Sequence, residues 1–248
     1  MSAPTAALVV VGNEVLSAKT VDENGPWAAR RLRELGVRLR TIATVPDRVD
    51  DVVEAVAREA RRSTWVFTSG GIGPTHDDVT IRAVGLAFGR PLERSARIVE
   101  VIRAHALRRY GREPHEASLR MADVPVGTVL EGDADFSTMR LENVFMLAGV
   151  PRFFRWQFER VAHLLGGVPL HLGQLFLSVG EDPIADAMAR IADAHPDVDI
   201  GSYPRFEDDA EYRVKLTVEG EDPERVRAVV AALRAALPEG ALLREELP

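Results

Sequence analysis

The first half of the chain alternates short apolar runs with stretches of helical periodicity, and this alternation constrains the fold more than any other feature. Residues 6–11 are continuously apolar and end at Gly12, which is typical of a strand buried on both faces of a parallel sheet. Residues 37–45 and 65–68 have the pattern of two more strands, each preceded by a stretch with apolar residues at helical spacing. Strands and helices in this order predict a three-layer α/β fold with a mostly parallel sheet.

A second, smaller domain is predicted after Gly166-Gly-Val-Pro169, a segment with the composition of a domain boundary. We therefore expect a first domain of residues 1–167 and a second of residues 168–248. The second has the order strand, helix, strand, strand, helix, which predicts a small α+β domain. Within it Gly180-Glu-Asp-Pro183 recurs as Gly220-Glu-Asp-Pro223, and each copy is predicted to open a helix with its Asp as N-cap.

Composition and charge restrict the classes of partner. The chain contains no Cys, which excludes disulfides, thiolate metal sites and cysteine nucleophiles. The apolar run at residues 6–11 is too short for a signal peptide or a membrane span, so a cytoplasmic protein with no membrane partner is expected. Residues 168–248 carry 17 Asp and Glu against 8 Lys and Arg, and this excess negative charge would repel a nucleic acid backbone. We expect a small-molecule partner and no nucleic acid.

The segment Ser69-Gly-Gly-Ile-Gly-Pro-Thr75 lies between the third predicted strand and a predicted helix. Backbone amides in such a position bind anions such as phosphate. Thr75 and Asp78 also have the spacing of a capping box at the start of that helix. The alternative is that the three glycines only make a tight turn. The agreement of strand, loop and helix favours phosphate binding.

Carboxylates gather at the same edge of the predicted sheet. Glu14 and Asp22 follow the first strand, Asp47 follows the second, and Asp77 and Asp78 end the Gly-rich loop. These groups would repel an anion unless a cation lay between them, and Mg²⁺ bridges carboxylate and phosphate oxygens. The alternative for each residue is a helix cap, or a first-turn position that the helix dipole favours by about 0.3–1 kcal/mol.

Four segments resemble the competence/damage-inducible protein A family and its molybdopterin-binding-like domain: Gly12-Asn-Glu14, Asp22-Glu-Asn24, Val45-Pro-Asp47 and Thr68-Ser-Gly-Gly-Ile-Gly-Pro-Thr-His-Asp-Asp78. The sequence is most similar to the version of this domain fused to eukaryotic FAD synthase. That similarity lies in residues 70–80 and in Ile200-Gly-Ser-Tyr-Pro204 with Val214-Lys-Leu-Thr217. The resemblance spans nearly the whole chain and implies a molybdopterin-binding-like fold followed by a domain described in the family as KH-like.

The resemblance implies a metal-dependent nucleotide pyrophosphatase that hydrolyses ADP-ribose or FAD with Mg²⁺, Mn²⁺ or Co²⁺. Related domains bind molybdopterin or adenylylate it in molybdenum cofactor biosynthesis, so a pterin ligand, adenylylation and binding without catalysis remain alternatives. We expect a homo-oligomer, with a dimer favoured. The expected catalytic residues are Glu14, Asp47 and Asp78, of which Asp47 and Asp78 also bind the metal. The expected ligand-binding residues are Gly12, Asn13, Asp22, Asn24, Thr68, Ser69, Gly70, Gly71, Gly73, Thr75 and Asp77.

The chain departs from the family pattern at several positions. Ala18 stands where the family has Gly, Glu23 stands where it has Thr, and Ala148 and Arg152 interrupt a Pro-Gly-x-Pro-x-Glu pattern. These departures leave the shape of the substrate open. No Gly-x-x-Gly loop follows residue 167, so RNA binding is not expected, and the second domain is predicted to have an architectural role.

Overall fold

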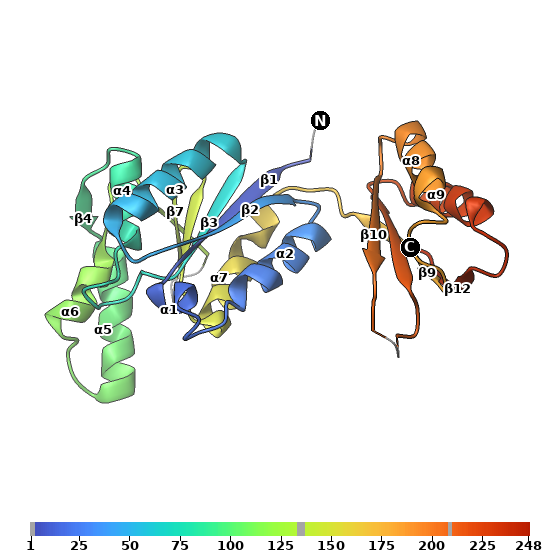
Figure 1. Cartoon of the computed structure of the whole chain (residues 1–248). Coiled ribbons are helices and arrows are strands. Elements are labelled where there is room, and N and C mark those ends of the chain that lie inside the picture. The colour runs from blue at the N-terminus through green and yellow to red at the C-terminus, as the bar shows by residue number, and fades with distance from the viewer. Residues whose placement is uncertain (1–2, 133–136, 208–209) are drawn as a thin grey trace. The chain divides into compact units, whose positions relative to one another are not determined.

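The computed structural model describes residues 3–132, 137–207 and 210–248. The chain divides into two compact units, Met1–Gly167 and Val168–Pro248. Each unit has its own sheet and its own hydrophobic core (Figure 1). In the described parts of the chain, no helix combines the length and the apolar composition that a membrane span requires.

The first unit is built on a six-stranded sheet with the order β2-β1-β3-β8-β7-β6. Neighbouring strands from β2 to β8 run parallel, and the last two are antiparallel to their neighbours. The strands are β1 (Thr5–Val11), β2 (Arg38–Val45), β3 (Trp65–Ser69), β6 (Val129–Glu131), β7 (Thr138–Leu141) and β8 (Val144–Leu147). This confirms the predicted mostly parallel α/β sheet.

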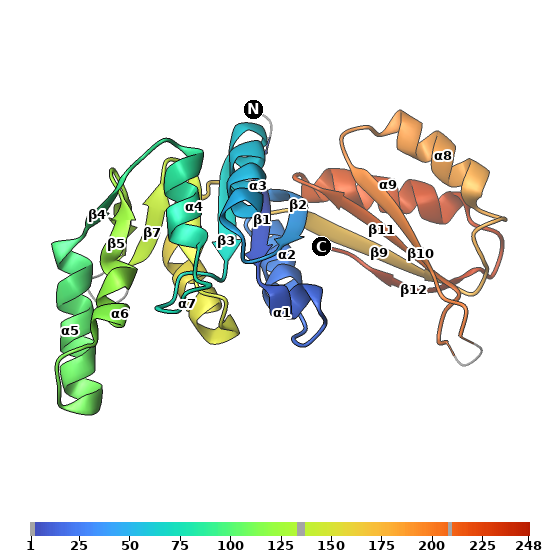
Figure 2. The ribbon, with the colours of Figure 1, turned by 60° about the vertical axis from the view of Figure 1, so that its left-hand side comes forward.

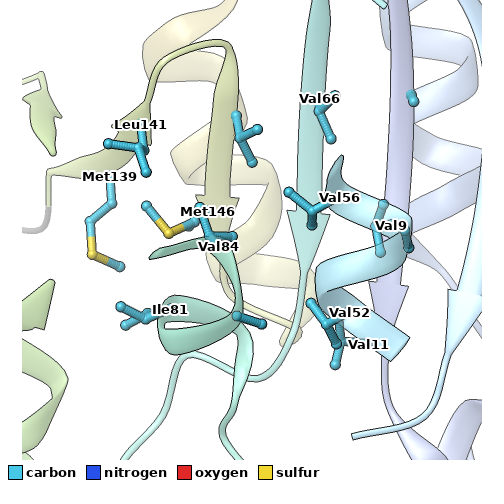
Figure 3. Close-up of a cluster of buried hydrophobic side chains, with 14 of the residues drawn as sticks. Val9, Val11, Val52, Val56, Val66, Ile81, Val84, Met139, Leu141 and Met146 are labelled. Atoms are coloured by element: carbon cyan, nitrogen blue, oxygen red, sulfur yellow. The ribbon is translucent and has the colours of Figure 1, made fainter. Parts of the chain in front are cut away.

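Helices cover both faces of this sheet (Figures 1 and 2). On one face lie α3 (Val49–Arg62) and α4 (Thr80–Ala87), and on the other α2 (Asn24–Glu34) and α7 (Pro151–Val161). Figure 3 shows the first core, in which aliphatic side chains of α3 and α4 point towards the sheet. The second core contains a cluster of aromatic rings: the Phe67 and Phe158 rings lie 4.9 Å apart, and the Trp27 ring meets Phe158 edge-on at 5.3 Å. These two cores confirm the three-layer fold.

Several elements of the first unit were not predicted. A single-turn helix, α1 (Asn13–Leu16), follows β1. Two short strands, β4 (Leu92–Arg94) and β5 (Asp123–Pro125), pair with each other outside the main sheet. Between them the chain forms α5 (Ala96–Tyr110), a helix that the sequence pattern of residues 94–110 does predict, and then α6 (Glu116–Leu119) and a short 3₁₀ turn, neither of which it predicts. A second 3₁₀ turn follows α7. The pairing of β4 with β5 holds both ends of the segment that contains α5.

The second unit is a four-stranded antiparallel sheet with the order β10-β11-β9-β12. Its elements are β9 (His171–Leu177), α8 (Ala185–Ala194), β10 (Asp199–Pro204), β11 (Val214–Gly220), α9 (Pro223–Ala236) and β12 (Leu242–Glu246). The predicted strand, helix, strand, strand, helix order is correct, but it lacked β12. That strand lies at an edge of the sheet, and its Arg244 and Glu246 are exposed, so it has no apolar alternation to reveal it.

The repeated Gly-Glu-Asp-Pro segment behaves differently in its two copies. The Asp222 carboxylate accepts hydrogen bonds from the backbone N–H groups of Glu224 and Arg225, so it caps α9 as predicted. The first copy does not cap α8, because that helix begins at Ala185 and Ile184 is its N-cap. The N-cap role predicted for Asp182 is therefore wrong.

This difference gives a test with a built-in control. We expect Asp222→Ala to lower the stability of α9 by about 1 kcal/mol, the usual value of an N-cap hydrogen bond. Asp182→Ala should leave α8 unchanged, since its carboxylate caps nothing. Amide hydrogen exchange across both helices measures the two effects separately. Equal loss of protection in the two variants would contradict the assignment of the caps.

Candidate functional site

A cavity lies where β1 and β3 end. These strands are parallel neighbours, with Val10 paired to Ser69. The chain leaves β1 for β2 on one side, whereas β3 lies on the other side, and open α/β sheets bind ligands at such a switch point. The cavity has a volume of about 860 Å³, and Val11 and Gly70 belong to its lining. This volume is large enough for a nucleotide.

The Gly-rich loop forms one wall of the cavity, and its glycines are required by their backbone conformation. Gly70 and Gly71 have φ angles of +98° and +67°. A Cβ atom would lie 2.4 Å from the Val11 carbonyl oxygen at Gly70, and 2.3 Å from Thr80 Oγ1 at Gly71. The Thr80 hydroxyl in turn donates to the Gly70 carbonyl oxygen at 2.8 Å, which fixes the loop against α4. Gly70 and Gly71 therefore make a tight turn, as the alternative interpretation of this loop predicts.

The backbone N–H groups of this loop divide into two kinds. The Gly70 N–H donates to the Leu147 carbonyl oxygen of β8 at 3.1 Å, so the predicted role of this amide in phosphate binding is wrong. The N–H groups of Gly71, Ile72 and Gly73 make no hydrogen bond to any of the described residues. These three residues all line the cavity. Consecutive unpaired amides at the wall of a cavity are suited to binding an anion.

The helix after the loop begins later than predicted. Its first residue is Thr80, so Asp77 and Asp78 precede α4 and lie outside its first turn. The predicted capping box is therefore wrong at this helix. Instead, the Thr75 N–H and hydroxyl donate to Asp78 Oδ2 at 2.8 and 2.5 Å, which closes a turn before the helix. The Thr75 hydroxyl also lies 2.5 Å from Asp77 Oδ1, and this hydrogen bond is the main cause that lowers the pKa of Asp77.

The three residues predicted to be catalytic all line the cavity. Glu14 comes from α1, Asp47 from the turn after β2, and Asp78 from the loop after β3. Asp47 Oδ2 accepts a hydrogen bond from the Asn13 N–H at 2.7 Å, which fixes the orientation of that carboxylate. The Glu14 carboxylate makes no hydrogen bond or ion pair within the described residues. The tertiary structure thus brings together carboxylates from three separate segments.

Other residues predicted to bind ligand do not line the cavity: Gly12, Asn13, Asp22, Asn24, Thr68 and Ser69. Asn24 is 4% exposed, and its Nδ2 donates to Ser69 Oγ at 2.8 Å and to the Gly149 carbonyl oxygen at 2.7 Å. It therefore joins the ends of β3 and β8. The Asp22 carboxylate accepts from the N–H groups of Asn24 and Gly25, which is the helix-cap alternative. Asp22 and Asn24 therefore fix the backbone around the site without lining the cavity.

The far side of the cavity was missed by sequence reasoning. It is formed by α5, by the segment before β5, by β6 and β7, and by the start of α7. The lining residues there are Arg97, Ile98, Val101, Ile102, Met121, Leu130, Met139, Arg152, Phe153 and Trp156. The apolar spacing of α5 is that of any helix packed on a core, and nothing in it indicates that part of the stripe borders a cavity.

The carboxylates are suited to a hard divalent cation that takes part of its coordination from the ligand. Within the described ranges, no three His, Asp or Glu side chains are placed to hold a metal ion together. Mg²⁺, however, is commonly bound by one or two carboxylates together with substrate phosphates and water. Asp47 and Asp78 each use one carboxylate oxygen in a hydrogen bond and keep the other. The chemistry of these donors fits a hard cation whose coordination a phosphate ligand completes.

Comparisons with known proteins support this description of the fold. A family model described as "Probable molybdopterin binding domain" matches residues 7–166, and one described as "FAD synthase, middle domain" matches residues 169–246. A crystal structure of the protein CinA, of unknown function, from Thermoplasma acidophilum matches with a TM-score of 0.58 and 26% identity. That match covers 66% of this chain and 99% of the other.

Two relatives show how far the similarity extends along the chain. A protein of Aeropyrum pernix is 33% identical and aligns over 82% of this chain and 80% of its own length. A probable FAD synthase of Caenorhabditis elegans is 29% identical over 94% of this chain but only 50% of its own length, so the chain spans about half of that relative. The resemblance predicted from the sequence is confirmed, and the chain belongs to the probable molybdopterin binding domain family, with a FAD synthase middle domain after it.

Proposed function

We propose that this chain hydrolyses the phosphoanhydride of a dinucleotide such as FAD or ADP-ribose, in a reaction that requires a divalent cation. One observation carries the proposal: three unpaired loop amides and the carboxylates of Glu14, Asp47 and Asp78 line a single cavity. A diphosphate needs donors for its oxygens, and the nearby carboxylates need a cation to offset their charge. Similarity to relatives named as FAD synthases supports a flavin nucleotide among the candidates.

The residues divide the work as follows. The N–H groups of the loop at residues 71–73 bind and orient the diphosphate. Asp47 and Asp78 would hold the cation, which supplies Lewis acidity at the anhydride and neutralises developing charge. Glu14, whose carboxylate is unpaired, accepts the proton of the attacking water. The water oxygen bonds to one phosphorus, and the bridging oxygen leaves with the other phosphate, so the products are AMP and a second monophosphate.

The proposal predicts that purified protein releases AMP from FAD or ADP-ribose in the presence of Mg²⁺, Mn²⁺ or Co²⁺. Chromatography of the nucleotide products measures the reaction, and a chelator provides the control. No AMP above that control from any dinucleotide would refute it. Tight binding of FAD or a pterin without turnover would favour a binding protein. Release of pyrophosphate from ATP in the presence of a pterin phosphate would favour adenylylation.

A further inference from the structure

We propose that one part of the cavity binds the ring of the ligand's second nucleotide or nucleoside, and that this part selects rings that are planar and carry no positive charge. We call this part the ring lobe, formed by Val101 and Ile102 of α5, Met121, and Phe153 and Trp156 of α7. The inference rests on the proposed function, because it concerns the same cavity. It goes further by stating which dinucleotides the site prefers and which residues determine that preference.

The first argument is the size and polarity of the cavity. Its volume of about 860 Å³ is near the upper end of small-molecule sites, which span about 300–1,000 Å³. The unpaired loop amides and the carboxylates belong to the Gly-rich loop and to the segments that follow β1 and β2. The side chains of the ring lobe are apolar or aromatic. A lobe of this kind beside a phosphate site fits a flat, largely apolar group.

The second argument is the orientation of the aromatic residues of α7. Phe154 and Phe158 are fully buried in the core between α7 and the sheet. Phe153 and Trp156 are 52% and 39% exposed, and both line the cavity. They are three residues apart and therefore lie on the same face of the helix. An exposed aromatic side chain on the wall of a cavity provides a surface on which a planar ring stacks, and Phe153 is such a side chain. The Arg160 guanidinium lies over the Trp156 ring, 4.4 Å from its centroid, so Trp156 borders this surface.

The third argument is the charge of the lobe. Arg97 of α5 and Arg152 of α7 line the cavity beside these apolar residues. Neither guanidinium group makes an ion pair or hydrogen bond with any residue in the described parts of the chain. The carboxylates of the cavity come from α1, from the turn after β2 and from the Gly-rich loop, and none comes from α5 or α7. Two unpaired cations disfavour a positively charged ring, such as oxidised nicotinamide, and favour a neutral one, such as flavin or reduced nicotinamide.

The experiment compares kcat/KM for AMP release from FAD, NADH, NAD⁺ and ADP-ribose. NADH and NAD⁺ are a matched pair, since their nicotinamide rings differ by one hydride and one positive charge. We expect wild-type protein to prefer NADH over NAD⁺ by about tenfold, and the double variant Arg97→Gln, Arg152→Gln to lose that preference. Arg109→Gln, on α5 but outside the cavity lining, is the control and should keep it.

Phe153→Ala tests the stacking surface. We expect the ratio of FAD to ADP-ribose turnover to fall about tenfold, since ADP-ribose ends in a ribose and has no planar aromatic ring at that end. Leu107→Ala is the control, because Leu107 is 50% exposed on α5 and does not line the cavity. A fall in Phe153→Ala that is equal for FAD and ADP-ribose, or a wild-type NADH to NAD⁺ ratio near one, would overturn the ring lobe while leaving the hydrolase proposal intact.

Failure of the hydrolase proposal is a separate outcome. If no dinucleotide gives AMP, the same variants are compared by quenching of flavin fluorescence on titration of FAD with protein and Mg²⁺. Weaker FAD binding in Phe153→Ala than in Leu107→Ala supports the ring lobe in a binding protein. Equal binding in the two variants refutes it.

Discussion

Asp78→Asn should lower metal-dependent AMP release by a factor of about 10² or more while leaving the melting temperature almost unchanged. The substitution removes a charge next to the diphosphate site, where a cation is to be held. It keeps an oxygen that can accept the Thr75 N–H hydrogen bond, now 2.8 Å long, so the turn before α4 should persist. Steady-state kinetics at limiting metal and a thermal melt measure the two effects.

Asp50→Asn is the matched control for this experiment. Asp50 is an exposed acid in the first turn of α3, so its loss removes a helix-dipole contribution of about 0.3–1 kcal/mol and nothing from the cavity. Turnover should therefore stay at the wild-type level in this variant. If the Asp78→Asn variant released AMP at the wild-type rate at limiting metal, the role of Asp78 would be limited to closing the turn at Thr75.

Gly70→Ala should destabilise the first unit and abolish nucleotide binding. A positive φ costs a residue with a side chain about 1–2 kcal/mol. At Gly70 the new Cβ would also lie 2.4 Å from the Val11 carbonyl oxygen, a backbone atom that cannot move without disturbing β1. The loop must shift, and with it the amides of residues 71–73. Urea denaturation followed by Trp fluorescence and titration with FAD measure the two losses.

Gly89→Ala separates the two causes. Gly89 also has a positive φ, +63°, but nothing lies within 4 Å of a Cβ built there. This variant should show only the conformational cost and should bind nucleotide as the wild type does. Equal destabilisation of the two variants would mean that the contact with Val11 is relieved at no cost, and that the loop is less rigid than its geometry indicates.

The sequence by itself determined the order of the main strands and helices and the class of the fold. Buried parallel strands appear as unbroken apolar runs, and the loop at residues 69–75 combines glycines with a flanking strand and helix, so both are local signals. The rule that parallel strands end at a common edge was enough to predict that Glu14, Asp47 and Asp78 line one site. The strand β12 escaped because its exposed charges carry no periodicity.

Only the tertiary structure decided which residues face the ligand cavity. Asn24 has the same local chemistry whether it binds a ligand or joins β3 to β8, and its partners Ser69 and Gly149 are distant in the sequence. The Gly70 amide is likewise taken by Leu147 of a strand formed much later in the chain. The ring lobe depends on α5 and α7 bordering one cavity. Such contacts depend on packing between distant segments, and a residue's own neighbours in the sequence do not encode them.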